Sequence, residues 1–165
     1  ICYKTFKQDY NLNIKVLHHT EYINELLNNS CNTLNRLGKT VVYHDPCELS
    51  RDIRIYDEPR RVLSEAATLL TAGKEKDDTL CCGGSLANFS ATAKQRSDIA
   101  MQAYSQINRA GADVMVTSCP MCKKVFERVS DVPVRDIAEL AVESMKMKKT
   151  VGSPVNEKHL AHEIH

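Results

Sequence analysis

The chain has 165 residues, of which 42% are hydrophobic, so it is long enough for one domain with a substantial core, or for one domain plus a fragment of a second. Its 22 basic and 21 acidic residues are interspersed and give a formal charge of +1, which excludes the strongly basic surface typical of nucleic-acid binding. No apolar run approaches the roughly 20 residues of a membrane-spanning helix, so we expect no direct insertion into a membrane.

The first half of the chain alternates between short apolar runs and amphipathic segments. It opens at Ile1 with neither a signal peptide nor a natural start, so we expect a piece of a longer protein. Residues 13–18 are prone to form a strand, and an amphipathic helix is predicted to begin at Thr20. Residues 39–44 are rich in β-branched side chains, which predicts a buried parallel strand that ends at an Asp-Pro pair just before Cys47.

The second half continues this alternation. Helices are predicted over 59–73, 89–109 and 136–148, a helix begins at Cys119-Pro120, and strands are predicted over 112–117 and 132–134. Because strands alternate with helices, we predict an α/β fold with a mostly parallel sheet flanked by helices. In such sheets the binding loops lie at the carboxyl ends of the strands.

Five of the seven cysteines form the pattern C-x33-C-C-x36-C-x2-C. The adjacent pair is strained as a disulfide but can present two thiolates to one metal centre, and the two glycines after it allow the backbone to turn with positive φ. The thiol at the start of the predicted helix feels the helix dipole, which lowers its pKa. We therefore predict a metal site formed by Cys47, Cys81, Cys82, Cys119 and Cys122.

The residues alone leave more than one metal open. Soft sulfur ligands select zinc or iron–sulfur chemistry, and because a tetrahedral zinc needs about four of them, the fifth favours a cluster. The alternatives are a zinc-stabilised structural or subunit-docking module, and ordinary cysteines or a redox disulfide. We expect the three loops to converge only through their thiolates. An odd number of cysteines, two of them adjacent, indicates a reducing compartment and hence a cytoplasmic protein.

These motifs resemble the cysteine-rich CCG domain of heterodisulfide reductase, which also occurs in the iron–sulfur subunits of anaerobic glycerol-3-phosphate, glycolate and lactate oxidoreductases. The matching motifs are His-Asp-Pro-Cys-Glu-Leu at 44–49, Cys-Cys-Gly-Gly at 81–84, Gly-Ala-Asp at 111–113 and Cys-Pro-x-Cys at 119–122. Many members carry histidine where Glu48 stands here, and this departure weakens the case for disulfide cleavage more than the case for a cluster.

The resemblance implies an electron-transfer or disulfide-reducing module of a larger oxidoreductase. A [4Fe-4S] cluster, noncubane in heterodisulfide reductase, would be bound by the same five cysteines. The implied partner is a flavin- or iron–sulfur-containing redox subunit, through which the protein would lie at the periphery of the inner membrane. No nucleic-acid partner is implied.

A partial internal repeat suggests the domain organisation. Residues 2–6 (CYKTF) resemble residues 122–126 (CKKVF), and the strand and helix expected over 16–27 resemble those expected over 134–142. We therefore predict that residues 1–32 are the end of a preceding CCG repeat, that 33–150 form the CCG domain, and that 151–165 are a flexible tail.

Other polar residues receive structural interpretations. Cys31 is expected to be a small structural residue, His18 and His19 to flank a strand end, and the three histidines of the tail to be solvated. The arginines that follow the first cysteine of the pattern are expected to form mainly a surface face with some charge compensation for an anionic cluster: Arg51, Arg54, Arg60 and Arg61.

Overall fold

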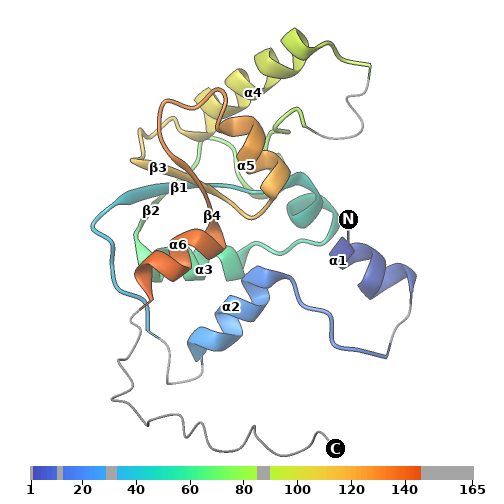
Figure 1. The fold of residues 1–165 in the computed structure, drawn as a ribbon, viewed down its shortest axis with the longest axis vertical. Coiled ribbons are helices and arrows are strands. Elements are labelled where there is room, and N and C mark those ends of the chain that lie inside the picture. Colours follow the sequence, from blue (N-terminus) through green and yellow to red (C-terminus); the bar gives the residue numbers. More distant parts are fainter. Residues whose placement is uncertain (1, 11–12, 29–32, 85–89, 146–165) are drawn as a thin grey trace, which may run out of the picture.

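The computed structural model describes residues 2–10, 13–28, 33–84 and 90–145 (Figure 1). The predictions made for Cys31 and for the tail from residue 151 onward lie outside the described residues. Four parallel strands form a sheet in the order β2-β1-β3-β4, which confirms the expected α/β fold. The strands are β1 (Thr40–His44), β2 (Thr68–Leu70), β3 (Val114–Thr117) and β4 (Val134–Asp136).

Helices cover both faces of this sheet. α2, α3 and α6 lie on one face, and α4 and α5 lie on the other (Figure 1). The α-helices are α1 (Cys2–Lys4), α2 (His19–Asn28), α3 (Asp57–Ala66), α4 (Ala93–Ile107), α5 (Pro120–Phe126) and α6 (Ile137–Ser144). Two π-helical turns, η1 (Thr5–Asp9) and η2 (Glu48–Asp52), and a 3-10 turn, η3 (Lys76–Asp78), connect them. None of the described helices combines the length and apolar character that crossing a membrane requires.

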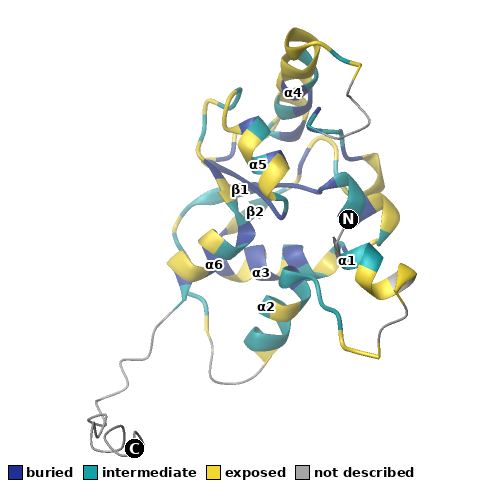
Figure 2. Ribbon diagram, turned by 45° about the vertical axis from the view of Figure 1, so that its right-hand side comes forward, coloured by how far each residue is buried: buried dark blue, intermediate teal, exposed yellow. Residues whose placement is uncertain are grey.

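The alternation of side chains along β1 divides the core into two layers. Val41 and Tyr43 pack with α3 and α6, together with Ile23 and Leu27 of α2. Val42 packs on the opposite side, with α4 and α5. Figure 2 shows the buried residues of β1 and of the inner face of α3, in contrast to the exposed first half of α4. The thiols lie on the α4–α5 side, since Cys82 and Cys122 belong to that layer.

Two helices begin where the sequence supplies a capping box. Thr92 accepts a hydrogen bond from the backbone N–H of Gln95, whose side chain returns to the N–H of Thr92, at the start of α4. Asp136 and Glu139 form the same arrangement at the start of α6. The second box fixes the direction in which the chain leaves β4, so that α6 packs back against α3.

Two of the expected elements are wrong. Residues 15–18 have no regular secondary structure and run directly into α2, and no described strand pairs with them. The helix expected over 59–73 ends at Ala66, and residues 68–70 form the edge strand β2, paired with β1. Leu69 packs into one core layer and Leu70 into the other. Such alternation belongs to a strand, but a short apolar run of this kind also fits a helical stripe, which explains the error.

Candidate metal centre

Three adjacent strands carry the thiol-bearing segments to one edge of the sheet. The chain leaves β1 and reaches Cys47, leaves β3 and reaches Cys119, and leaves β2 through η3 to reach Cys81. β1 and β3 are neighbours in the sheet. In the sequence, β2 comes between these two strands, but in the sheet it lies on the other side of β1. The strand order therefore reverses beside Cys47 and Cys119, which is where open α/β sheets place their binding sites.

The structure brings the five predicted thiols into contact with one another. Hydrogen bonds between thiols link them into a continuous chain in the order Cys47, Cys81, Cys82, Cys122 and Cys119. None of these five is in a disulfide, and Cys82 and Cys122 are buried while the others are half-buried. Residues up to 75 positions apart in the sequence thus contribute sulfur atoms to one site.

The thiol chain contains two sulfurs with a strong preference for the thiolate form. Hydrogen bonds from Cys47 and Cys82 lower the pKa of Cys81, and the backbone N–H of Gly83 adds to this effect. The hydrogen bond from Cys122 lowers the pKa of Cys119 to about 6, against the effect of burial. The same bonds raise the pKa of the donors Cys47 and Cys122. Because thiolates are the metal-binding form, the site is electronically suited to a cation or cluster.

The two glycines after the adjacent cysteines let the backbone approach the sulfur atoms. Gly83 has φ of 82°, and its N–H donates to Cys81 Sγ at 3.4 Å. The N–H of Gly84 donates to Cys82 Sγ at 3.4 Å. A Cβ at Gly84 would lie 2.8 Å from Val125 Cγ2 and 3.1 Å from Met121 Cγ, so only glycine lets α5 pack this close.

The site combines soft sulfur donors with backbone N–H groups. Among the described residues, no three side chains of His, Cys, Asp or Glu are grouped in a way that fits one metal ion. The sulfurs form a chain in which each contacts its neighbours, and backbone N–H groups donate to two of them. An extended row of soft donors with N–H groups beside it is the environment that iron–sulfur clusters require.

His44 links the three thiol-bearing segments independently of the thiols. Its Nε2 lies 3.1 Å from the carbonyl oxygen of Leu80, and its Nδ1 lies 3.2 Å from Thr117 Oγ1. Burial lowers the pKa of His44 to about 4, so the imidazole is neutral near pH 7. The expectation that the loops converge only through their thiolates is therefore wrong.

A second link joins the loop before Cys81 to the end of β1. The buried side-chain carboxylate of Asp45 accepts a hydrogen bond from the backbone N–H of Lys76 at 2.8 Å. The backbone carbonyl of Asp45 accepts a second one from Thr79 Oγ1 at 2.9 Å. Arg60 of α3 donates to both oxygens of this carboxylate. The prediction that Arg60 belongs to a surface face is wrong, because its side chain is only 15% exposed.

Arg51 lies close to the thiols. Its guanidinium donates to the carbonyl oxygen of Thr79 at 2.6 Å, and its positive charge lowers the pKa of Cys47 and Cys81. Arg61 is exposed and contacts Asn28 Oδ1 of α2, as expected for a surface residue. Charge compensation near the site thus comes from Arg51.

A cavity of about 260 Å³ lies beside Cys119, between the turn after β1 and the N-terminal segment. His18 and His19 line it with their rings 4.2 Å apart, and burial lowers the pKa of His18 to about 4. Their predicted position at a strand end is wrong, because no described strand precedes them: His19 is the first residue of α2, and His18 comes directly before it. Nε2 of His19 is buried and lies 3.8 Å from Asp136 Oδ1, beyond hydrogen-bonding distance.

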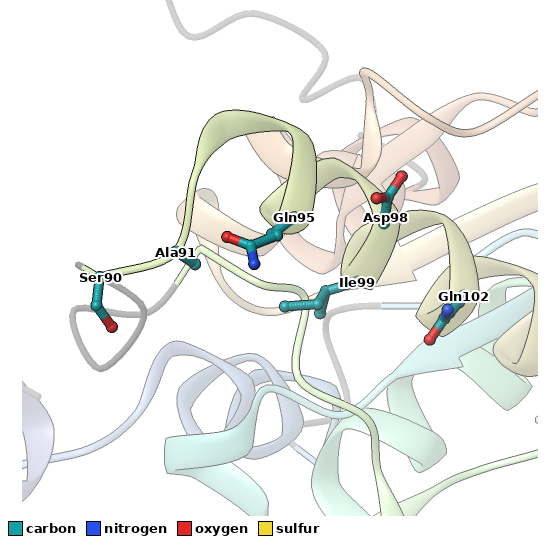
Figure 3. Close-up of a pocket in the computed structure, with 6 residues that line it drawn as sticks. All are labelled: Ser90, Ala91, Gln95, Asp98, Ile99 and Gln102. Carbon is teal, nitrogen blue, oxygen red and sulfur yellow. The ribbon is translucent and has the colours of Figure 1, made fainter.

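A separate open hollow of about 430 Å³ lies along α4 (Figure 3). Side chains from successive turns of the helix line it, and Ser90 and Ala91 of the preceding turn complete its described wall. The helical residues are Gln95, Asp98, Ile99 and Gln102. None of the thiols is among these residues.

Sequence reasoning identifies the thiols but misses the residues that connect their loops. His44 and Asp45 stand out only as part of a motif, and no local pattern marks Thr79 or Thr117. The role of His44 could have been inferred from the alternation of side chains along β1. Because side chains of a strand point alternately to the two faces, His44 shares a face with Val42, which lies in the same core layer as Cys82 and Cys122.

The family comparison agrees with this geometry. The family model described as "CCG: Cysteine-rich domain" matches residues 41–127, from β1 to just after α5. The chain belongs to this family. The matched region contains the five thiols, His44, Asp45 and the two glycines.

The chain is also similar to parts of several larger proteins. It is 27% identical over 161 residues to a subunit of the dihydromethanophenazine:CoB–CoM heterodisulfide reductase of Methanosarcina barkeri, covering 87% of this chain and 39% of that protein. It is 30% identical over 151 residues to an iron–sulfur protein of Methanococcus maripaludis, covering 84% of this chain and 30% of the relative. A subunit of the fumarate reductase (CoM/CoB) of Methanothermobacter marburgensis is 27% identical over 148 residues, with coverages of 84% and 30%. The chain thus spans well under half the length of these relatives.

Proposed function

We propose that the chain is an iron–sulfur module that transfers electrons within a heterodisulfide reductase-like oxidoreductase. The observation that carries this proposal is the continuous row of five thiols, contributed by three segments at the edge of a parallel sheet. The printed names of the relatives, an iron–sulfur protein and two oxidoreductase subunits, support the same conclusion.

In this proposal a [4Fe-4S] cluster is held by Cys47, Cys81, Cys82, Cys119 and Cys122, and when bound it supplies reversible one-electron storage. The chain controls the environment of the sulfurs. The N–H groups of Gly83 and Gly84 donate to two of them, which stabilises negative charge on the ligands. Cys82 and Cys122 sit within the buried apolar layer formed with α4 and α5, which limits access of water from that side.

The partners follow from the redox role. We propose a flavin- or iron–sulfur-containing subunit as electron partner, a cytoplasmic location, and membrane association only through such a partner. The zinc-stabilised docking module is the rival hypothesis. The row of five thiols favours the cluster, because a tetrahedral zinc needs only four ligands.

Anaerobic reconstitution with iron and sulfide, followed by a redox titration monitored by electron paramagnetic resonance, tests this function. We expect a paramagnetic signal that appears and disappears reversibly with a one-electron dependence on potential. Replacing Cys47 with alanine should remove it, because Cys47 ends the row of thiols. Uptake of zinc in place of iron and sulfide, with no redox-dependent signal, would support the docking module instead.

A further inference from the structure

One imidazole touches all three segments that lead to the thiols. His44 is the last residue of β1 and lies three positions before Cys47. Leu80, whose carbonyl it contacts at 3.1 Å, immediately precedes Cys81. Thr117, which it contacts at 3.2 Å, is the last residue of β3 and lies two positions before Cys119. The ring is thus carried by the segment that leads to Cys47 and contacts the chain next to the other two thiol-bearing turns.

The chemistry of the partners fixes the direction of both hydrogen bonds. The carbonyl of Leu80 only accepts, so Nε2 of His44 carries the proton and donates to it. Nδ1 of the neutral ring is then an acceptor, and the hydroxyl of Thr117 donates to it. Leucine at position 44 would break both bonds and leave the partners unsatisfied, whereas glutamine carries an NH2 group that donates and an oxygen that accepts.

Packing holds the ring in the plane that these bonds need. His44 is 1% exposed, so water does not readily replace a lost partner. The ring meets Phe126 of α5 edge-on, with centroids 4.8 Å apart and an interplanar angle of 70°. Because α5 also carries Cys122, this ring contact connects the helix that bears Cys122 to the same imidazole.

We propose that His44 is a positioning residue that holds the three thiol-bearing segments in register before any metal binds. This inference rests on the proposed function in one respect: the purpose of aligning the three segments is taken to be assembly of the cluster. The hydrogen bonds themselves join protein groups, and neither of them involves a thiol. His44 therefore acts through the loops and is not itself a ligand.

The test compares four forms of the intact protein: wild type, His44→Leu, His44→Gln and Val62→Ala. The last is a matched control, because Val62 is fully buried but belongs to the core layer on the face opposite the thiols. In the metal-free forms, hydrogen exchange is measured for amides 80–84 and 117–119 relative to those of α3. After anaerobic reconstitution, iron and sulfide per folded protein and the linewidth of the paramagnetic signal are measured.

We expect exchange at these amides to be about tenfold faster in His44→Leu than in wild type, with intermediate values in His44→Gln. Iron affinity should fall by about 10- to 100-fold in His44→Leu, as for other residues that orient metal ligands, and glutamine should restore part of it. Val62→Ala should lower thermal stability without changing either readout.

Unchanged exchange in His44→Leu would overturn the proposal, as would iron loading and linewidth equal to those of wild type. An equal effect of Val62→Ala would overturn it too, because general loss of stability would then explain the result. If wild type takes up neither iron nor sulfide, the proposed function is wrong, and the exchange measurement still decides the role of His44 in the metal-free protein.

Discussion

The carboxylate of Asp45 and the guanidinium of Arg60 form a two-point ion pair, with oxygen–nitrogen distances of 2.8 and 2.7 Å. The carboxylate side chain is 1% exposed and the guanidinium side chain 15% exposed, so solvent screens the pair only weakly. Through Lys76 and Thr79 the same aspartate holds the loop that leads to Cys81. The ion pair is thus part of the framework beneath the thiols.

Arg60→Met should destabilise the metal-free protein strongly, by about 3–5 kcal/mol, because it leaves the buried carboxylate of Asp45 without its counter-ion. Arg61→Met is the matched control. Arg61 is the next residue but is exposed, and its loss should change the free energy of unfolding by about 0.5 kcal/mol or less. Denaturant unfolding of both variants measures the difference. Equal effects would show that the ion pair has no special role.

Gly84→Ala should lower both stability and iron content, because the added Cβ would overlap Val125 Cγ2 and force α5 away from Cys82. We expect a loss of about 1–3 kcal/mol, typical of overpacking a tight contact. The double variant Gly84→Ala/Val125→Ala removes the overlapping methyl groups and should recover iron content relative to Gly84→Ala. Failure of the second substitution to recover any iron would count against steric displacement as the cause.

Cys82→Ala should abolish cluster binding while leaving the metal-free fold largely intact. The loops remain joined by His44 and by Asp45, so we expect the free energy of unfolding without metal to change by only about 1 kcal/mol. Iron analysis and thermal unfolding of the same preparation give both values. Cys31→Ala is the control that should retain iron. Complete unfolding of metal-free Cys82→Ala would show that the thiol itself is essential to the fold.

Acid should destabilise the metal-free protein as pH falls from about 6.5 to about 4. Burial lowers the pKa of both His44 and His18 to about 4, so the unfolded chain binds more protons in this window. The stability they contribute is complete above pH 6.5 and is lost as pH falls through the window. Each histidine contributes a slope of up to about 1.4 kcal/mol per pH unit. Denaturant unfolding at several pH values should show a shallower slope for His44→Gln; an identical slope would contradict this assignment.

The fold class and the convergence of the thiols could be predicted because local signals agree there. The β-branched run of β1 and the helix start at Cys119-Pro120 each follow from neighbouring residues. β2 escapes prediction because its three residues pair with β1 by tertiary contact, while their apolar pattern also continues the stripe of α3. Local patterns are weakest for such short edge strands.

The residues that hold the site together depend on register, which a single sequence does not reveal. His44 meets Thr117 because these two residues are direct partners in the β1–β3 ladder. A shift of one residue in that ladder would turn one of them to the opposite face. Likewise, Arg60 reaches Asp45 only because α3 packs directly beneath the end of β1, a placement set by the core as a whole.

Metal and sulfide analysis of the intact protein, purified without exposure to oxygen, tests the central claim most directly. Iron, acid-labile sulfide and zinc would be measured on the same sample and normalised to protein. We predict about four iron and four sulfide for each copy of the thiol row, with little zinc. Stoichiometric zinc without sulfide would contradict the account and identify the site as a structural metal centre.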